Sequence, residues 1–308
     1  MKKIQLHNLL IFTALLVLQA CHQQKDSAVQ RLFPMPPDTS HIPVFITHLS
    51  QQDVVGIISE KSINRNGKIR TTGDPDTPKN GVDFRGYHFD NTDWKMAQLQ
   101  DGDFRGNYFR SANCNVCDFS YSDFRVGDLQ SASFNKATLF GCNFDQSSMF
   151  FLHANNALMD SSSFRGANMF GVYANNASLR HCNFSNAIIK DAQIANADFS
   201  GSIAIKTSFM GSVLVESKFD STDLSYSNFI GAGLEKASFI NARLHAASFN
   251  SANLVNVNFS GADLKNCDFS SAEFRNTNFT GAINIPEILK EKIQDNHYTG
   301  VLYYKKGT

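Results

Sequence analysis

The chain has 308 residues, of which 42% are hydrophobic and 18% are charged, a composition that excludes a disordered polyelectrolyte. Lysine plus arginine and aspartate plus glutamate both number 28, so the formal net charge is zero and no overall field attracts nucleic acid or an anionic membrane. The 27 phenylalanines against a single tryptophan indicate that a repeated pattern selects phenylalanine.

The N-terminus has the pattern of a signal peptide. Lys2 and Lys3 precede an apolar run, residues 9–18, that is about half as long as the roughly 20 residues of a membrane-spanning helix. The run ends in Leu-Gln-Ala-Cys, which resembles the lipobox of bacterial lipoproteins. The resemblance implies a lipoprotein signal peptide over 1–20, lipidation of Cys21, and a mature chain anchored by lipid at the bacterial cell envelope, in either the inner or the outer membrane. A plain secretory signal peptide is the alternative.

Two segments separate this signal from the rest of the chain. Residues 21–43 contain several glutamines and prolines and show no sustained apolar period, which predicts a tether. Residues 44–80 contain two apolar runs and an Asn66-Gly67 pair typical of a hairpin turn, which predicts a small N-terminal module.

An apolar residue, in most cases a large one, then recurs every five residues from Phe84 to Phe279, without a phase slip over forty positions. Twenty of these central positions are phenylalanine and ten are leucine. The side chain two residues earlier is small, except at Tyr87, Asn107 and Leu152. The residue between the two is often aspartate, asparagine or serine. This pattern resembles the A(D/N)(L/F)xx repeat of the pentapeptide-repeat family.

A period of five fits neither an α-helix nor a continuous strand, so the backbone must turn in every repeat. The small and central residues are two apart and therefore point the same way from a short extended stretch. The resemblance implies an all-β fold over residues 82–284, a right-handed quadrilateral β-helix solenoid with four repeats per coil and about ten coils. The sequence itself supports a coil of twenty residues, because 149–157 is echoed by 169–177.

Residues 285–308 predict a C-terminal helical cap over the open end of the solenoid. Asn284 is the expected N-cap, with Glu287 three residues later. Because this end forms the dimer in gyrase-protecting relatives, the resemblance makes it a candidate homodimer surface. The apolar face expected for the helix comprises Ile285, Ile288, Leu289 and Ile293.

Cys114 and Cys117 have the CxxC spacing of redox and metal sites. They and the cysteines at 142, 182 and 267 occupy inward positions of the repeat, which favours buried structural thiols. A Cys114–Cys117 redox pair remains the alternative. The nine histidines show no ligand-like spacing, and the serines lack a nucleophile motif. The sequence therefore predicts no metal, no cofactor and no catalytic residues.

Charged residues repeat along one face. The carboxylates Asp83, Asp103 and Asp123 are each one coil apart and, taken alone, could act as a general acid/base cluster. A neighbouring column of arginines instead favours an outward ladder of alternating charges that neutralises itself, with a specific ion site as the alternative. The arginine column comprises Arg85, Arg105, Arg125 and Arg165.

A second column predicts a partner surface. The residue after each central position should face solvent, and along one corner these residues are mostly apolar, with Lys190 among them. A contiguous apolar patch of this kind is typical of interaction sites. Coverage of the patch by the 44–80 module is the alternative. The candidate partner surface comprises Phe150, Phe151, Phe170, Met210 and Ile230.

These features predict a non-catalytic, lipid-anchored binding or scaffolding protein of the bacterial envelope, whose partner is a protein or a polysaccharide. The alternative is a DNA-mimic regulator of a topoisomerase such as gyrase, the role of the best-known members of the family. Residues 82–284 carry 19 acidic and 15 basic side chains, which is a weak negative charge for a DNA mimic. A third hypothesis places an enzyme site in the 44–80 module.

Overall fold

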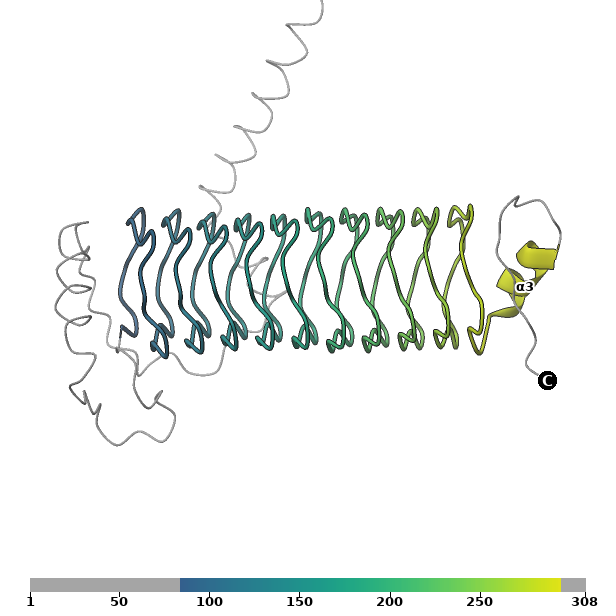
Figure 1. Ribbon diagram of the computed structural model, residues 1–308, viewed down its shortest axis with the longest axis horizontal. Helices are drawn as coiled ribbons and strands as arrows, with labels where there is room; N and C mark the ends of the chain where they lie inside the picture. Colours follow the sequence, from purple (N-terminus) through teal and green to yellow (C-terminus); the bar gives the residue numbers. More distant parts are fainter. Residues whose placement is uncertain (1–83, 295–308) are drawn as a thin grey trace, which may run out of the picture. The chain divides into compact units, whose positions relative to one another are not determined.

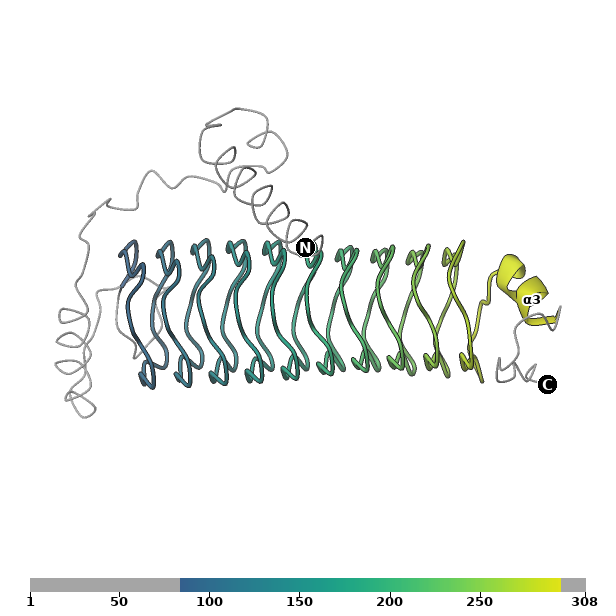
Figure 2. The same cartoon turned by 90° about the horizontal axis from the view of Figure 1, so that it is seen from above.

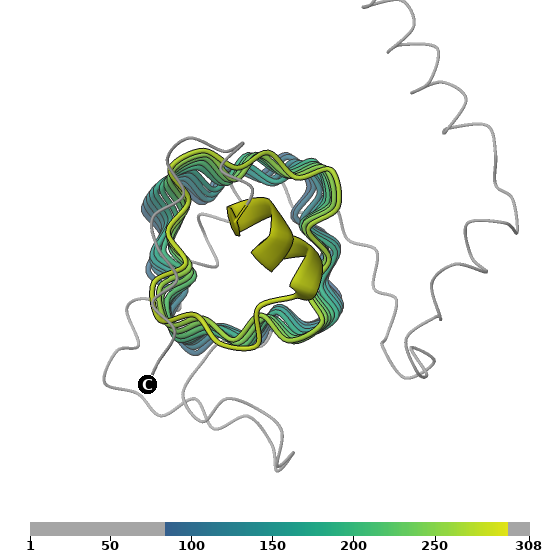
Figure 3. The ribbon, with the colours of Figure 1, turned by 90° about the vertical axis from the view of Figure 1, so that its right-hand side faces the viewer.

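A computed structural model describes residues 84–294, which form a β-helix solenoid followed by one short helix (Figure 1). The solenoid is built from parallel β-bridges, each joining a residue to the one twenty positions later, from His88–Tyr108 to Asp263–Ile283. The view along the solenoid shows four sides (Figure 3), and the view from above shows coils stacked without interruption (Figure 2). The expected β-helix solenoid is confirmed.

Several predicted segments lie outside the described residues. They are the signal peptide 1–20 with the lipidation site Cys21, the tether 21–43, the module 44–80, the ladder residue Asp83, and residues 295–308 of the predicted cap. Within residues 84–294, no helix is long and apolar enough to cross a membrane.

A tight turn follows every central residue and forms the corners of the coil. At the first corner the carbonyl oxygen of Phe84 accepts a hydrogen bond from the backbone N–H of Tyr87, 3.3 Å away. The second turn residue, Gly86, has a φ of 72°, and a positive φ recurs at this position in each repeat up to Gly281. This geometry is that of a type II turn, which favours glycine and asparagine at its second central position.

Backbone hydrogen bonds join each coil to the next. The N–H of Phe104 donates to the carbonyl oxygen of Asp123 at 2.7 Å, and the N–H of Asp123 donates to the carbonyl oxygen of Gly102 at 2.8 Å. The same pair of bonds recurs along the four sides and leaves the bridge residue's side chain pointing outward. Each coil therefore depends on its neighbours, as in other solenoids.

The interior is a shaft of stacked apolar side chains. All forty central positions are buried, none more than 6% exposed. The rings of Phe104 and Phe124 stack with centroids 4.9 Å apart and planes 6° apart. In the C-terminal half of the solenoid, two ring columns pack edge to face against each other. One comprises Phe199, Phe219, Phe239, Phe259 and Phe279. The other, not anticipated from the sequence, comprises Phe209, Phe229, Phe249 and Phe269. Burial of each ring contributes about 1.5–3 kcal/mol to folding.

The C-terminal helix α3 spans Glu287–Gln294 and differs from the sequence-based expectation. Asn284 is not its N-cap, because Asn284 has a φ of 54° and its Nδ2 donates to Asp263 Oδ1 at 2.8 Å. The first helical bond instead runs from the N–H of Lys290 to the carbonyl oxygen of Pro286. Ile285 and Leu289 are buried with the shaft residues, whereas Ile288 is 53% exposed.

Candidate functional site

The predicted partner surface lies on the corner that follows the central residues Met149 and Met169. The rings of Phe150 and Phe170 are half-buried, with centroids 6.2 Å apart. Phe151 is 44% exposed and meets Phe170 edge to face at 5.6 Å. The structure therefore brings these three rings together on the outside of the solenoid, where they add nothing to the shaft.

Met210 and Ile230 continue along the same corner as single apolar side chains. Met210 is half-buried and Ile230 is 37% exposed. They are separated from Phe170 by Lys190, which occupies the same corner one coil later. The aromatic part of the predicted surface is thus confined to two adjacent coils.

A glycine allows the aromatic cluster to pack closely. The positive φ of Gly171, 65°, favours glycine, and a Cβ atom at this position would lie 2.6 Å from the ring of Phe151. The ring of Phe151 therefore lies directly over the backbone of the next coil. A larger residue at 171 would displace it.

Two further aromatic residues beside this corner were missed by the sequence analysis. Tyr173 and His153 are bridge residues on the adjacent side, and their rings stack with centroids 4.8 Å apart. Tyr173 is 37% exposed. His153 and Tyr173 are twenty residues apart, so the sequence would have indicated this pair if the bridge positions had been compared together with the corner positions. We call Phe150, Phe151, His153, Phe170 and Tyr173 the aromatic cluster.

Within its own two coils the aromatic cluster has no charged neighbours along the chain, and the nearest charges on its corner are Lys190 and Asp191 of the next coil. Segments 146–157 and 166–177 contain no aspartate, glutamate, lysine or arginine. The far corner of this side carries an asparagine ladder, in which Asn155 Oδ1 accepts the backbone N–H of Asn175 at 3.0 Å and Asn175 Oδ1 accepts that of Ala195 at 2.8 Å. The ladder fixes the backbone next to the cluster. An aromatic patch in a neutral, rigid setting has the composition of the centre of a protein interface.

The predicted charge ladder is continuous over the first coils. Asp103 accepts two hydrogen bonds from the guanidinium of Arg105 and lies 3.6 Å from Arg85 Nε. Asp123 is 2.6 Å from Arg125 and 3.8 Å from Arg105. The alternating carboxylates and guanidinium groups therefore neutralise one another.

Two details of this ladder differ from the expectation. The residues Asp103 and Asp123 are only 2% and 7% exposed, because the arginine side chains cover them, so the carboxylates do not face solvent. Arg165 does not continue the ladder, since its partner is Asp145, 2.6 Å away in the arginine column itself. Asp145 was not predicted as part of the ladder, because it stands where the column otherwise carries arginine.

A further pair joins Asp160 and Arg180 on another corner. Burial alone would raise the pKa of Asp160, but hydrogen bonds from Arg180 and Ser178 outweigh it and hold that pKa below its ordinary value. The Asp160 carboxylate therefore acts as an ion-pair acceptor and is not poised as an acid at neutral pH.

The cysteines within the described residues are buried free thiols. Cys117, at a small-residue position, donates its S–H to the carbonyl oxygen of Trp94 at 2.7 Å, as Ser212 donates its hydroxyl to that of Ile189. Burial raises the pKa of Cys182 and that of Cys267 to about 12, and burial next to Cys117 raises that of Cys114. The protonated, enclosed thiols are poor nucleophiles and poor metal ligands.

No group of three or more histidine, cysteine, aspartate or glutamate side chains within residues 84–294 is arranged to hold a metal ion. His153 stacks on Tyr173 and His245 meets Tyr226 edge to face, so both take part in aromatic packing.

A comparison with protein-family models agrees with the five-residue repeat seen in the coils. The family model for pentapeptide repeats matches eight copies in four overlapping segments, 162–201, 192–229, 217–254 and 242–281. The matched residues, 162–281, make up less than half of the chain, and over them the chain is similar to pentapeptide repeats. No curated protein matches the chain.

Several solved structures resemble the chain weakly. Full-length QnrB1, a plasmid-mediated fluoroquinolone resistance protein, is 14% identical, with a TM-score of 0.40 and coverage of 70% of this chain and 97% of that chain. HetL, involved in heterocyst differentiation regulation in the cyanobacterium Nostoc sp. strain PCC 7120, is 17% identical, with a TM-score of 0.34 and coverage of 66% and 89%. A pentapeptide repeat protein of the Arabidopsis thaliana thylakoid lumen is 27% identical, with a TM-score of 0.31 and coverage of 36% and 79%.

Proposed function

We propose that this pentapeptide-repeat protein is a non-catalytic, lipid-anchored binding or scaffolding protein of the bacterial envelope, and that its aromatic cluster is the surface that binds a protein partner. In this proposal Cys21 carries the lipid, residues 84–283 form ten coils, and α3 closes their C-terminal end. The solenoid acts as a rigid rod that holds the cluster at a fixed place.

The observation that carries the proposal is the position of the aromatic cluster. A corner side chain is not needed to fill the shaft, and most corners carry serine, asparagine, glycine or charged residues. Phe150, Phe151 and Phe170 instead leave a contiguous, partly exposed apolar surface in contact with water. Such a surface costs free energy unless a partner covers it.

The alternative, a DNA-mimic regulator of a topoisomerase, is less well supported by the charge distribution. A DNA mimic needs a row of unpaired carboxylates, whereas Asp103, Asp123, Asp145 and Asp160 are each bound by an arginine. The neutralised columns would present little negative potential to a DNA-binding groove.

Replacement of two rings tests the proposed surface. The double variant Phe150→Ser/Phe170→Ser should lose specific partners in a pull-down from envelope extract, while its free energy of unfolding falls by less than about 2 kcal/mol, since both rings are already half-exposed. Phe140→Ser is the matched control, because Phe140 is a 39% exposed corner ring on a different corner. A loss of several kcal/mol in the double variant would show that the cluster is an internal contact.

A further inference from the structure

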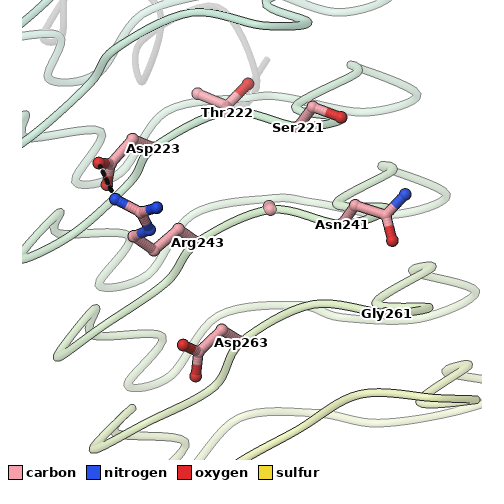
Figure 4. Close-up of a pocket in the computed structure, with 8 residues that line it drawn as sticks. Ser221, Thr222, Asp223, Asn241, Arg243, Gly261 and Asp263 are labelled. Carbon is pink, nitrogen blue, oxygen red and sulfur yellow. Dashed lines mark hydrogen bonds and ion pairs between the residues drawn. The ribbon is translucent and has the colours of Figure 1, made fainter.

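A polar groove lies on a different side of the solenoid, near its C-terminal end. It has a volume of about 350 Å³ and runs between two columns of side chains from three successive coils (Figure 4). One column is Asp223, Arg243 and Asp263, and the other is Ser221, Asn241 and Gly261. This volume is at the lower end of the range for small-molecule sites.

Arg243 is held more loosely than the other arginines that bind an aspartate one coil away. Arg165 and Arg180 each bind their aspartate through both Nε and Nη2. Arg243 makes one bond, from Nη1 to Asp223 Oδ2 at 3.1 Å, and its side chain is 67% exposed. Its remaining N–H groups are therefore available to a ligand in the groove.

Asp263 supplies a complementary acceptor at the other end of the column. Its Oδ1 is already bound by the side chain of Asn284 and the backbone N–H of Lys265, whereas no bond to Oδ2 is found among residues 84–294. Across the groove, a Cβ atom at Gly261 would lie 2.2 Å from Asn241 Oδ1, so the glycine leaves room for the amide to lie across the next coil. The groove thus combines hydrogen-bond donors and acceptors on both of its sides.

The charge of the lining restricts the ligand. Two carboxylates and one guanidinium give a net charge of minus one, which disfavours an anion, while Arg243 disfavours a cation. Neighbouring hydroxyl groups of a sugar can both donate to a carboxylate and accept from a guanidinium or an amide. We propose that this groove binds a neutral carbohydrate, with Arg243 as donor and Asp263 as acceptor. This site is separate from the aromatic cluster and does not depend on its function.

Saturation-transfer NMR with the full chain tests the site, with cellobiose and chitobiose as neutral probes and a glucuronate-containing disaccharide as the anionic probe. At least one neutral probe should receive saturation, and Arg243→Ala or Asp263→Asn should weaken its binding by about tenfold, since each loses a charge-assisted hydrogen bond. Arg165→Ala is the matched control, because it removes an exposed arginine from an ion pair outside the groove, and it should leave binding unchanged.

Three results would overturn the proposal. Absence of saturation for both neutral probes, or equal binding by Arg243→Ala and the wild-type chain, would overturn the proposal. Tighter binding of the anionic probe than of the neutral probes would also overturn it, because the groove would then prefer a charged ligand to a neutral one. An unchanged melting temperature for Arg243→Ala would show that lost binding is not lost folding. If the sugar signal is lost while the chain still binds its envelope partners, the result concerns the groove alone and does not affect the proposed role of the aromatic cluster.

Discussion

The second residue of each turn has a positive φ, and the side chains at this position tolerate it unequally. Asparagine and glycine adopt this conformation readily, but the chain also places Val116 there with a φ of 61°. A β-branched side chain is strained in the left-handed region. Because Val116 is 45% exposed, its burial offers little compensation.

Val116→Gly should therefore raise the free energy of unfolding by about 0.5–1 kcal/mol, since relief of the left-handed strain exceeds the entropy cost of glycine. Thermal or chemical denaturation measures the change. Val215→Gly is the matched control, because Val215 is the first turn residue of its repeat and its φ is not positive. That variant should be destabilised by about 0.5–1 kcal/mol. Equal changes in both variants would contradict the turn assignment.

At the scale of elements, the last coil has no further coil to stack on, so the shaft is open at its C-terminal end. Helix α3 lies across this end in the view along the solenoid (Figure 3). Leu289 is 1% exposed and belongs to the same buried cluster as the shaft residues, whereas Ile288 in the same helix points to solvent. The helix thus contacts the shaft through one side only.

Leu289→Lys should detach α3 and expose the last coil, because a charged group cannot be buried there without a partner. We expect a loss of about 2–4 kcal/mol and concentration-dependent association, measured by denaturation and by size-exclusion chromatography with light scattering. Ile288→Lys should remain a stable species of wild-type size. If the two variants behave alike, α3 does not cap the shaft.

The period of five was sufficient to assign every central residue to the interior, since each repeat faces the same steric requirement. Contacts between coils were harder to predict. Asp145 was missed because it replaces an arginine within a column, and Tyr173 because it belongs to the bridge column and not to the corner column. The N-cap at Asn284 was wrong because a further turn with positive φ precedes the helix. These features depend on which side chains meet across twenty residues, which the period alone does not specify.

At the scale of the whole molecule, the proposed function joins a rigid solenoid to a membrane anchor. In this proposal the lipid is attached to Cys21, so Cys21→Ala should abolish labelling by a fatty-acid analogue and leave the chain unprocessed or released from membranes. Metabolic labelling followed by membrane fractionation measures both effects. Cys142→Ala, at a buried small-residue position, is the control and should be labelled normally. Unchanged labelling of Cys21→Ala would rule out the lipobox.

Photo-crosslinking in intact cells tests the central claim, that the aromatic cluster binds a partner. The photoreactive residue p-benzoylphenylalanine replaces Phe151 in one strain and Tyr121 in another. Both are exposed aromatic residues at the second turn position, 44% and 56% exposed, on different corners. We expect a discrete crosslinked adduct from position 151 that is absent from position 121 and is lost when Phe170→Ser is added. Equal crosslinking from both positions, or none from position 151, would contradict it.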